Sequence, residues 1–209
     1  MIDFILHLDT HLLAMVREYG VWIYAILFLI IFCETGLVAT PFLPGDSLLF
    51  VAGTLAAGGA LKLEWLLPLL MLAAFSGDNS NYWIGRLAGL KLVRRLVGRL
   101  IKKEYLDRTH EFYERHGGKT ILFARFLPIF RTFAPFVAGI GLMRYRLFVI
   151  FSAAGSIAWI TSISLAGYAF GDIPVVKNNL TLMTLVVILL SFLPAILRFL
   201  HHLRSRRGK

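Results

Sequence analysis

The sequence predicts an all-α polytopic membrane protein with two inverted repeats, each a re-entrant helical hairpin followed by a transmembrane helix. Three observations support this prediction: a high apolar content, uncharged stretches long enough to span a bilayer, and one phrase that occurs twice. The chain of 209 residues is 58% hydrophobic, with a mean hydropathy of +0.74, whereas soluble domains average roughly 45–50% apolar residues. Residues 147–171 and 180–197 contain no charge, and each stretch can cross a hydrocarbon core of about 30 Å.

The phrase that occurs twice joins Phe-Leu-Pro to a downstream Phe-Val-Ala-Gly. One copy begins at Phe42 and the other at Phe126. After each copy two glycines lie twelve positions apart, at 77 and 89 and again at 155 and 167. A duplicated hydrophobic unit that proline and glycine interrupt is typical of a transporter core.

The charge distribution sets the expected orientation in the membrane. Residues 86–119 hold ten basic and four acidic residues, and the tail from Arg198 holds five basic residues and no acidic one. Basic segments that flank membrane spans lie in the cytoplasm. Both termini are then cytoplasmic, the two hairpins enter from opposite sides, and the two units are inverted.

Six segments are expected along a single membrane domain. They are an interfacial N-terminal helix, a first repeat unit, a cytoplasmic basic amphipathic connector, a second repeat unit, a last transmembrane helix and a basic cytoplasmic tail. They cover residues 1–19, 20–90, 91–118, 119–171, 180–198 and 199–209. Apolar residues recur at helical spacing between the basic residues of the connector, as in a helix that lies on a membrane surface.

Re-entrant hairpins are expected over about 37–59 and 119–145. Prolines and a glycine within 41–45 prevent a straight helix in the first hairpin, and prolines are expected to break the second between 128 and 135. The span between the hairpins begins near Glu64 and is expected to kink at Pro68. Irregular backbone at membrane depth requires cover from protein or a watery cavity.

Five charges are expected at membrane depth, where each costs roughly 2.5–3.5 kcal/mol if it is left at the centre of a helix. They are Glu34, Asp46, Asp78, Arg125 and Arg131. We therefore expect these side chains to pair across the repeat interface instead of facing lipid. Ionisable residues in this position mark a substrate or ion path by default.

Arg125 and Arg131 are the expected phosphate-binding residues, because a planar guanidinium binds phosphate oxygens bidentately. A break near Pro128 would let both side chains reach one cavity. Ser47 and Thr132 lie near the starts of the hairpin helices, where backbone N–H groups would add donors for an anion. Asp46 or Ser47 is expected to cap the first of these helices.

Glu34 and Asp46 have two interpretations. They either neutralise the arginines or exchange protons, since desolvation favours the protonated form of a carboxyl group. Asp78 and Asn79 are expected to give polar support between helices. A structural alternative is that two buried ion pairs only hold the hairpins together.

Several functions are not expected. No Gly-x-Ser-x-Gly or His-Glu-x-x-His motif is present, so we predict no enzyme. His110 and His116 lack cysteine or acidic residues at ligand spacing, so we expect no metal and no cofactor. The net charge of +10 lies around the spans, which indicates a membrane protein and no nucleic-acid partner.

Several longer motifs resemble the DedA family of bacterial inner-membrane proteins, also described as the VTT or SNARE-associated superfamily. The main ones are Glu34-Thr35-Gly36-Leu37, Pro41-Phe42-Leu43-Pro44-Gly45-Asp46-Ser47, Gly77-Asp78-Asn79, Arg125-Phe126-Leu127-Pro128 and Arg131-Thr132-Phe133-Ala134-Pro135. The resemblance covers about residues 10–200. It implies two opposed re-entrant hairpins, dependence on the proton gradient, and lipid carriage: undecaprenyl phosphate flipping in some members and phospholipid scrambling in eukaryotic relatives. The family's essential acidic pair maps onto Glu34 and Asp46, and its essential arginine pair onto Arg125 and Arg131.

The sequence therefore predicts a multi-pass flippase of the bacterial inner membrane. Its expected partners are a lipid phosphate (undecaprenyl phosphate or a phospholipid), protons and membrane lipids, and the sequence leaves a homo-oligomer open. A proton-linked antiporter of small cations or drugs, a general phospholipid scramblase and a non-transporting membrane scaffold are the alternatives.

Overall fold

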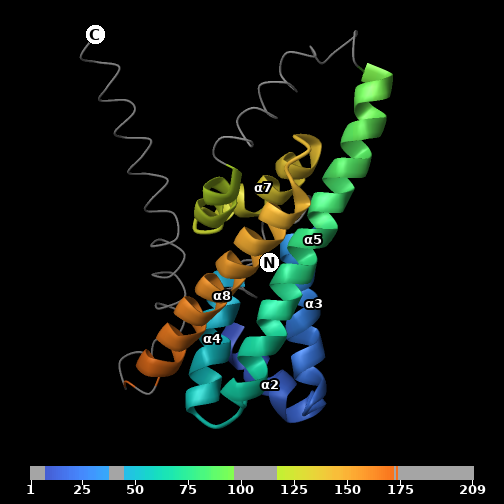
Figure 1. The fold of residues 1–209 in the computed structure, drawn as a ribbon. Helices are drawn as coiled ribbons and strands as arrows, with labels where there is room; N and C mark the ends of the chain where they lie inside the picture. Colours follow the sequence, from blue (N-terminus) through green and yellow to red (C-terminus); the bar gives the residue numbers. More distant parts are fainter. Residues whose placement is uncertain (1–7, 38–44, 97–116, 172, 174–209) are drawn as a thin grey trace, which may run out of the picture. The chain divides into compact units, whose positions relative to one another are not determined.

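A computed structural model describes residues 8–37, 45–96, 117–171 and 173 (Figure 1). Every regular element in these ranges is an α-helix, which confirms the all-α class for this part of the chain. The helices are α2 (Leu8–Tyr19), α3 (Trp22–Gly36), α4 (Gly45–Ala57), α5 (Leu63–Leu96), α7 (Pro128–Ile140) and α8 (Tyr145–Phe170). Residues 117–124 are also helical.

Helix α8 is the one helix among the described residues that is long and apolar enough to cross a membrane. Its 26 residues cover almost all of the expected span at 147–171. Helices α3 and α4 and residues 130–140 are apolar but shorter. The expected last span at 180–198 lies outside the described residues. So do the tail, most of the connector and residues 38–44 of the expected first hairpin.

Helix α5 is longer than expected. It runs without interruption from Leu63 to Leu96 and includes Pro68. A proline inside a helix removes one backbone hydrogen bond. Pro68 lies close to the start of α5, and the helix continues beyond it. The expected boundary at residue 91 between span and connector therefore falls inside one continuous helix.

The second hairpin breaks earlier than expected. The chain turns at 125–127, and α7 then runs from Pro128 through Pro135 to Ile140. Proline at the first position of a helix lacks only an N–H that has no intrahelical partner there, so Pro128 starts the helix. The expected break between 128 and 135 is wrong: Arg131 lies on a helix, one turn after the actual break.

Helix α4 begins at Gly45, so Asp46 and Ser47 lie within its first turn and do not precede it as caps. The helix ends at Ala57, and the chain turns at Gly58 and Gly59, as expected. Gly59 has a φ of +76°, a conformation that glycine adopts without the steric cost of a side chain.

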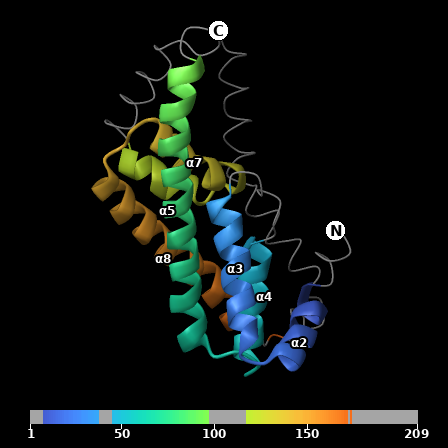
Figure 2. The ribbon, with the colours of Figure 1, turned by 90° about the vertical axis from the view of Figure 1, so that its right-hand side faces the viewer.

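The chain divides into two compact units. Unit 1 comprises residues 1–23, 44–63 and 162–209, and unit 2 comprises 24–43 and 64–161. In unit 1, α2 contacts α4. In unit 2, α3 lies alongside α5, and α7 lies across α5 (Figure 2).

Within unit 1, α4 and α8 approach so closely that glycine is required on both. A Cβ atom on Gly53 would overlap the carbonyl oxygen of Ser164 and lie 3.0 Å from the backbone nitrogen of Tyr168. A Cβ atom on Gly167 would lie 2.9 Å from the carbonyl carbon of Phe50. Such contacts bring two helix backbones together, as in the small-residue interfaces of membrane helices.

Unit 2 contains the same arrangement between α7 and α5. A Cβ atom on Gly139 would overlap the carbonyl oxygen of Tyr82 and lie 2.7 Å from the backbone nitrogen of Arg86. A Cβ atom on Gly85 would lie 2.9 Å from the carbonyl carbon of Phe136. In each unit, the helix with the Phe-Val-Ala-Gly phrase packs on a helix from the other predicted repeat.

The glycine contacts pair the two copies differently from the sequence. Gly85 faces Phe136 and Gly167 faces Phe50, and each of these Phe residues opens a Phe-Val-Ala-Gly segment. The sequence paired Gly167 with Gly89, which lies four residues, or about one helical turn, after Gly85.

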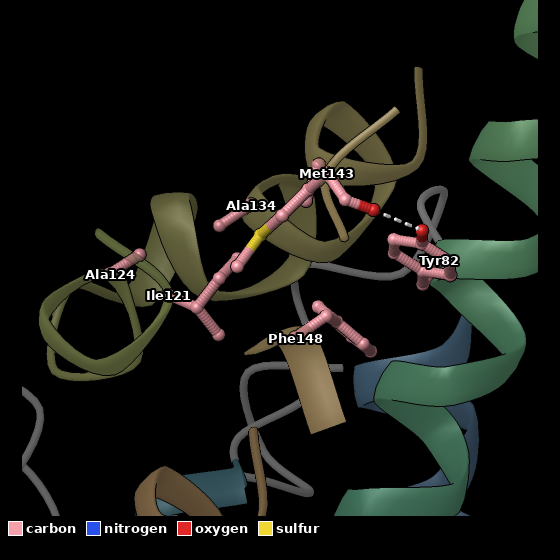
Figure 3. Packing of buried hydrophobic residues seen from close by; sticks show 7 residues of the cluster. Tyr82, Ile121, Ala124, Ala134, Met143 and Phe148 are labelled. Carbon is pink, nitrogen blue, oxygen red and sulfur yellow. Dashed lines mark hydrogen bonds between the residues drawn. The ribbon is translucent and has the colours of Figure 1, made fainter. Parts of the chain in front are cut away.

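The apolar core of unit 2 connects α5, α7 and α8 (Figure 3). Tyr82 is fully buried there and stacks on Phe148, with 4.4 Å between ring centroids. Its hydroxyl donates a hydrogen bond of 2.6 Å to the carbonyl oxygen of Met143. This bond ties the loop after α7 to α5.

Candidate functional site

Two buried ion pairs lie in unit 2. Arg131 on α7 pairs with Glu34 at the end of α3, and Arg125 in the turn before α7 pairs with Asp78 on α5. At most 6% of any of these four side chains is exposed. Protein therefore surrounds these charges, and four of the five charges that the sequence expects at membrane depth are paired.

Further polar contacts surround the Arg125–Asp78 pair. The hydroxyl of Ser152 on α8 donates to Oδ2 of Asp78 at 2.6 Å. Nη1 of Arg125 also donates to the carbonyl oxygen of Ser152, at 3.4 Å. Gly155, one turn further along α8, leaves room for the stem of Arg125, since a Cβ atom there would lie 3.1 Å from Cδ of Arg125.

Trp159 brings the two arginines to a single aromatic ring. Cζ of Arg131 lies 4.3 Å from the ring centroid and Cζ of Arg125 lies 5.5 Å from it. Both distances fall within the range of a cation–π interaction, which is strongest on tryptophan. Trp159 is 2% exposed, so the interaction is desolvated.

Asn81 holds the helices around this cluster in place. Its amide nitrogen donates to the carbonyl oxygens of Thr35 at 3.0 Å and of Thr132 at 2.7 Å. The backbones of α3 and α5 are in close contact nearby, because a Cβ atom on Gly77 would lie 3.1 Å from the nitrogen of Gly36. This contact places the end of α3, and with it Glu34, beside α5.

The cluster retains unused hydrogen-bonding atoms. Within the described part of the chain, Nε and Nη2 of Arg125, Oδ1 of Asp78 and Oδ1 of Asn81 are buried and make no hydrogen bond. Leaving such a group unsatisfied costs about 1–3 kcal/mol, and more for a charged one. The free edge of Arg125 therefore suits an anionic oxygen, the chemistry that the sequence predicts for this residue.

The predicted site residues divide between the two units. Unit 2 contains Glu34, Asp78, Asn79, Arg125, Arg131 and Thr132, whereas Asp46 and Ser47 belong to unit 1. Ser47 is fully buried and Asp46 is half-buried, both in the first turn of α4. In unit 2, the carboxylate beside Arg125 belongs to Asp78, which was expected among the pairing charges and as polar support, but not in the acidic pair.

Asn79 follows Asp78 but serves a different contact. Its amide nitrogen donates to the carbonyl oxygen of Phe75 at 2.7 Å, and its Oδ1 accepts from the hydroxyl of Tyr145 at 2.9 Å. Thr132 is fully buried, and its carbonyl oxygen accepts from Asn81.

Sequence reasoning missed Ser152 and Trp159 as site residues. Both lie in an uncharged span, where serine and tryptophan resemble ordinary packing residues. The two residues are seven positions apart, which places both on one face of α8. This spacing is the feature of the sequence that could have identified them. Among the described residues, no group of three or more His, Cys, Asp and Glu side chains could hold a metal ion.

The described residues form a helical protein with a charged site inside it, and α8 is long and apolar enough to cross a membrane. The VTT domain family matches residues 43–169. The chain is 54% identical to the protein DedA of Escherichia coli K12 over 207 residues, which cover 98% of this chain and 94% of that protein. The chain belongs to the DedA family.

Two further relatives support a membrane location. An uncharacterized membrane protein of Mycobacterium tuberculosis H37Rv is 42% identical over 182 residues, which cover 86% of this chain and 80% of that protein. The inner membrane protein YghB of Escherichia coli K12 is 35% identical over 178 residues, which cover 85% of this chain and 78% of that protein. No solved structure matches the chain.

Proposed function

We propose that the protein translocates a lipid phosphate across the bacterial inner membrane in a process coupled to protons, with undecaprenyl phosphate as the first candidate. The observation that supports this function most is the pair of buried arginines on one tryptophan ring, with Nε and Nη2 of Arg125 unpaired. The guanidinium fork matches two phosphate oxygens. We therefore assign phosphate binding to Arg125 and Arg131, with Ser47 and Thr132 as further polar residues of the proposed site.

The proposed architecture is a multi-pass protein with two inverted repeats, re-entrant hairpins at about 37–59 and 119–145, and both termini in the cytoplasm. The matching glycine contacts within the two units support the repeat, since Gly53 and Gly139 pack in the same way on α8 and α5. Transporters with inverted repeats bind substrate near the membrane midplane at the interface between the repeats.

Proton coupling is proposed to follow from competition for the arginines. A phosphate that binds Arg131 displaces Glu34 from its partner. An ionised carboxylate buried without a cation is costly, so Glu34 then takes up a proton. Asp46 is proposed for the same role on the first hairpin. Asp78 is a further candidate, because it forms the ion pair with Arg125.

A proton-linked antiporter of small cations or drugs uses the acids as cation ligands. The ion pairs argue against it, because Glu34 and Asp78 each already contact a guanidinium. A general scramblase would use the same arginines without proton coupling, and a membrane scaffold would need only the structural ion pairs. We propose a transporter and not an enzyme.

Purified protein in liposomes distinguishes these functions. The assay follows a fluorescently labelled undecaprenyl phosphate and a labelled phosphatidylglycerol in separate samples, with and without a pH gradient. The proposal expects faster movement of the first lipid, and faster still with the gradient. Equal rates for both lipids without any gradient effect would indicate a scramblase. Cation flux without lipid movement would indicate an antiporter, and neither activity would leave the scaffold.

A further inference from the structure

A cationic cavity lies in unit 2, formed by Arg86 on α5 and by residues 142–147 in the loop after α7 and the first turn of α8. Its volume is about 760 Å³. None of its lining residues belongs to the cluster around Arg125 and Arg131. The function proposed above makes no use of it.

The cavity combines positive charge with apolar surface. Three of its lining residues are arginines: Arg86, Arg144 and Arg146. Among the described residues that line it, none is acidic. Leu142 and Leu147 are part of the same lining and are exposed. A ligand that bears both an anionic group and an apolar chain matches this combination.

Arg86 is held in a fixed position. Its Nη1 donates to the hydroxyl of Tyr82 at 2.8 Å, and that hydroxyl donates to the carbonyl oxygen of Met143 (Figure 3). Cζ of Arg86 also lies 5.7 Å from the ring centroid of Trp83. A side chain that is already ordered loses less conformational entropy when it binds a ligand, and the remaining donors of Arg86 are available for an anion.

The loop of the cavity has an unusual backbone. The amide of Met143 donates to the carbonyl oxygen of Ala138, and that of Leu142 donates to the carbonyl oxygen of Gly139. These two bonds form a Schellman motif, whose left-handed position is usually glycine. Here Leu142 occupies it, with a φ of +53°. Residues held in such sparsely populated conformations cluster at binding sites.

We propose that this cavity binds a phosphate group, and that a membrane lipid carries that phosphate in its headgroup. The three arginines bind the phosphate oxygens, with Arg86 as the ordered anchor. The exposed leucines contact the start of the acyl chains. Free inorganic phosphate shares the anionic chemistry but would leave the apolar part of the lining without a partner.

Trp83 supplies a local readout for the test, because its ring lies against Arg86. The full-length protein in phosphatidylcholine nanodiscs is titrated with dihexanoyl phosphatidic acid, inorganic phosphate or dihexanoyl phosphatidylcholine, and tryptophan emission is recorded. We expect a saturable change with phosphatidic acid and a weaker response to phosphate. We expect none with phosphatidylcholine, because its choline cation neutralises its phosphate and is repelled by the arginines. Trp83→Phe, which keeps an aromatic ring, should abolish the change.

Two substitutions, Arg144→Gln together with Arg146→Gln, should weaken phosphatidic acid binding about tenfold or more, the loss expected for hydrogen bonds to a charged group. Both side chains are exposed, so the protein should still fold. Lys119→Gln also removes an exposed positive charge, from outside the cavity, and should leave binding unchanged.

Binding that persists in the double arginine variant, or that Lys119→Gln weakens equally, would overturn the proposal. The absence of any saturable response in the native protein would overturn it as well. Phosphate that binds as tightly as phosphatidic acid would support the arginine site and overturn its assignment to a lipid.

Discussion

Arg131 on α7 forms a buried ion pair with Glu34 on α3, across 97 positions of sequence. The pair joins α7 to the end of α3. Trp159 covers the guanidinium from α8. One arginine is therefore in contact with side chains from two other helices, so a ligand that moves it would affect all three elements.

The Arg125–Asp78 pair resembles the Arg131–Glu34 pair without duplicating it. Arg125 lies in a turn, whereas Arg131 lies on a helix. Ser152 adds a second hydrogen bond to Asp78, and part of the Arg125 guanidinium is unpaired among the described residues. We therefore expect the two arginines to differ in how readily they accept a phosphate.

Arg125→Lys and Arg131→Lys should each lower the rate of lipid movement in liposomes by about tenfold or more, the loss expected for a hydrogen bond to a charged group. Lysine keeps the positive charge, and thus the ion pair, but lacks the planar fork. The level of membrane-inserted protein should stay close to that of the native protein. Lys119→Arg, an exposed exchange of the same two residue types, should change neither quantity.

Native rates in both lysine variants would leave the arginines only as point charges. A collapse of protein levels would mean instead that the ion pairs are structural.

Asp78→Asn should destabilise the fold by about 3–5 kcal/mol, because it leaves Arg125 buried without its counter-ion. The free energy of unfolding in detergent measures this loss. Asp78→Asn combined with Arg125→Gln should recover part of it, since no uncompensated charge then stays buried. The interaction energy of the double-mutant cycle isolates the pair. An additive cycle would show that the two side chains do not interact in solution.

The glycine contacts within the two units predict matched effects on stability. Gly53→Ala and Gly139→Ala should each cost about 1–3 kcal/mol, the usual penalty for overpacking, because each new methyl group would meet backbone atoms that cannot rotate away. Gly58→Ala is the control, since its nearest neighbours would lie 3.8 Å away. Thermal unfolding of the three variants provides the comparison, and three equal melting temperatures would contradict the close packing.

The sequence was sufficient to predict the helical class and the pairing of four of the five charges expected at membrane depth. These follow from local quantities: apolar content, residue type and the cost of an unpaired charge in lipid. The choice of partner was not predictable in the same way. Asp78 pairs with Arg125 because α5 packs beside the turn at 125–127, and no periodicity in the sequence encodes that contact.

Pro135 shows a second limit. It was expected to lie in a break, yet α7 continues through it. A proline removes one hydrogen bond and disfavours a helix, but packing on both sides can outweigh that loss. The actual break, at 125–127, lies directly before Pro128, and the extended backbone of Leu127 is the conformation that a following proline favours.

Trp159 should act as a positioning residue for both arginines. Trp159→Leu removes the ring and should lower the affinity for the lipid phosphate by about tenfold or more, in line with roughly 2 kcal/mol for a desolvated cation–π contact. Trp159→Phe keeps a smaller ring and should restore part of the affinity. A purely structural role would lower the unfolding temperature of the leucine variant and leave the affinity of the folded protein intact.

Phosphate binding and proton uptake should be coupled through the carboxylates that oppose the arginines. When a lipid phosphate binds Arg131, Glu34 loses its cation in a buried position and gains a proton, and such coupling is reciprocal. Glu34→Gln with Asp46→Asn should therefore remove the pH dependence of lipid binding. Glu64 is the control, because its carboxyl group is exposed. Glu64→Gln should keep the pH dependence of lipid binding.

Calorimetry in two buffers of different ionisation enthalpy measures the protons directly. The native protein should show different apparent binding enthalpies in the two buffers at one pH, because the proton that Glu34 takes up comes from the buffer. The double variant should show the same enthalpy in both, since neither amide can accept that proton. A difference between the two buffers that persists in the double variant, with its pH dependence intact, would exclude these carboxylates as the coupling groups and leave Asp78, through its pair with Arg125, as the next residue to substitute.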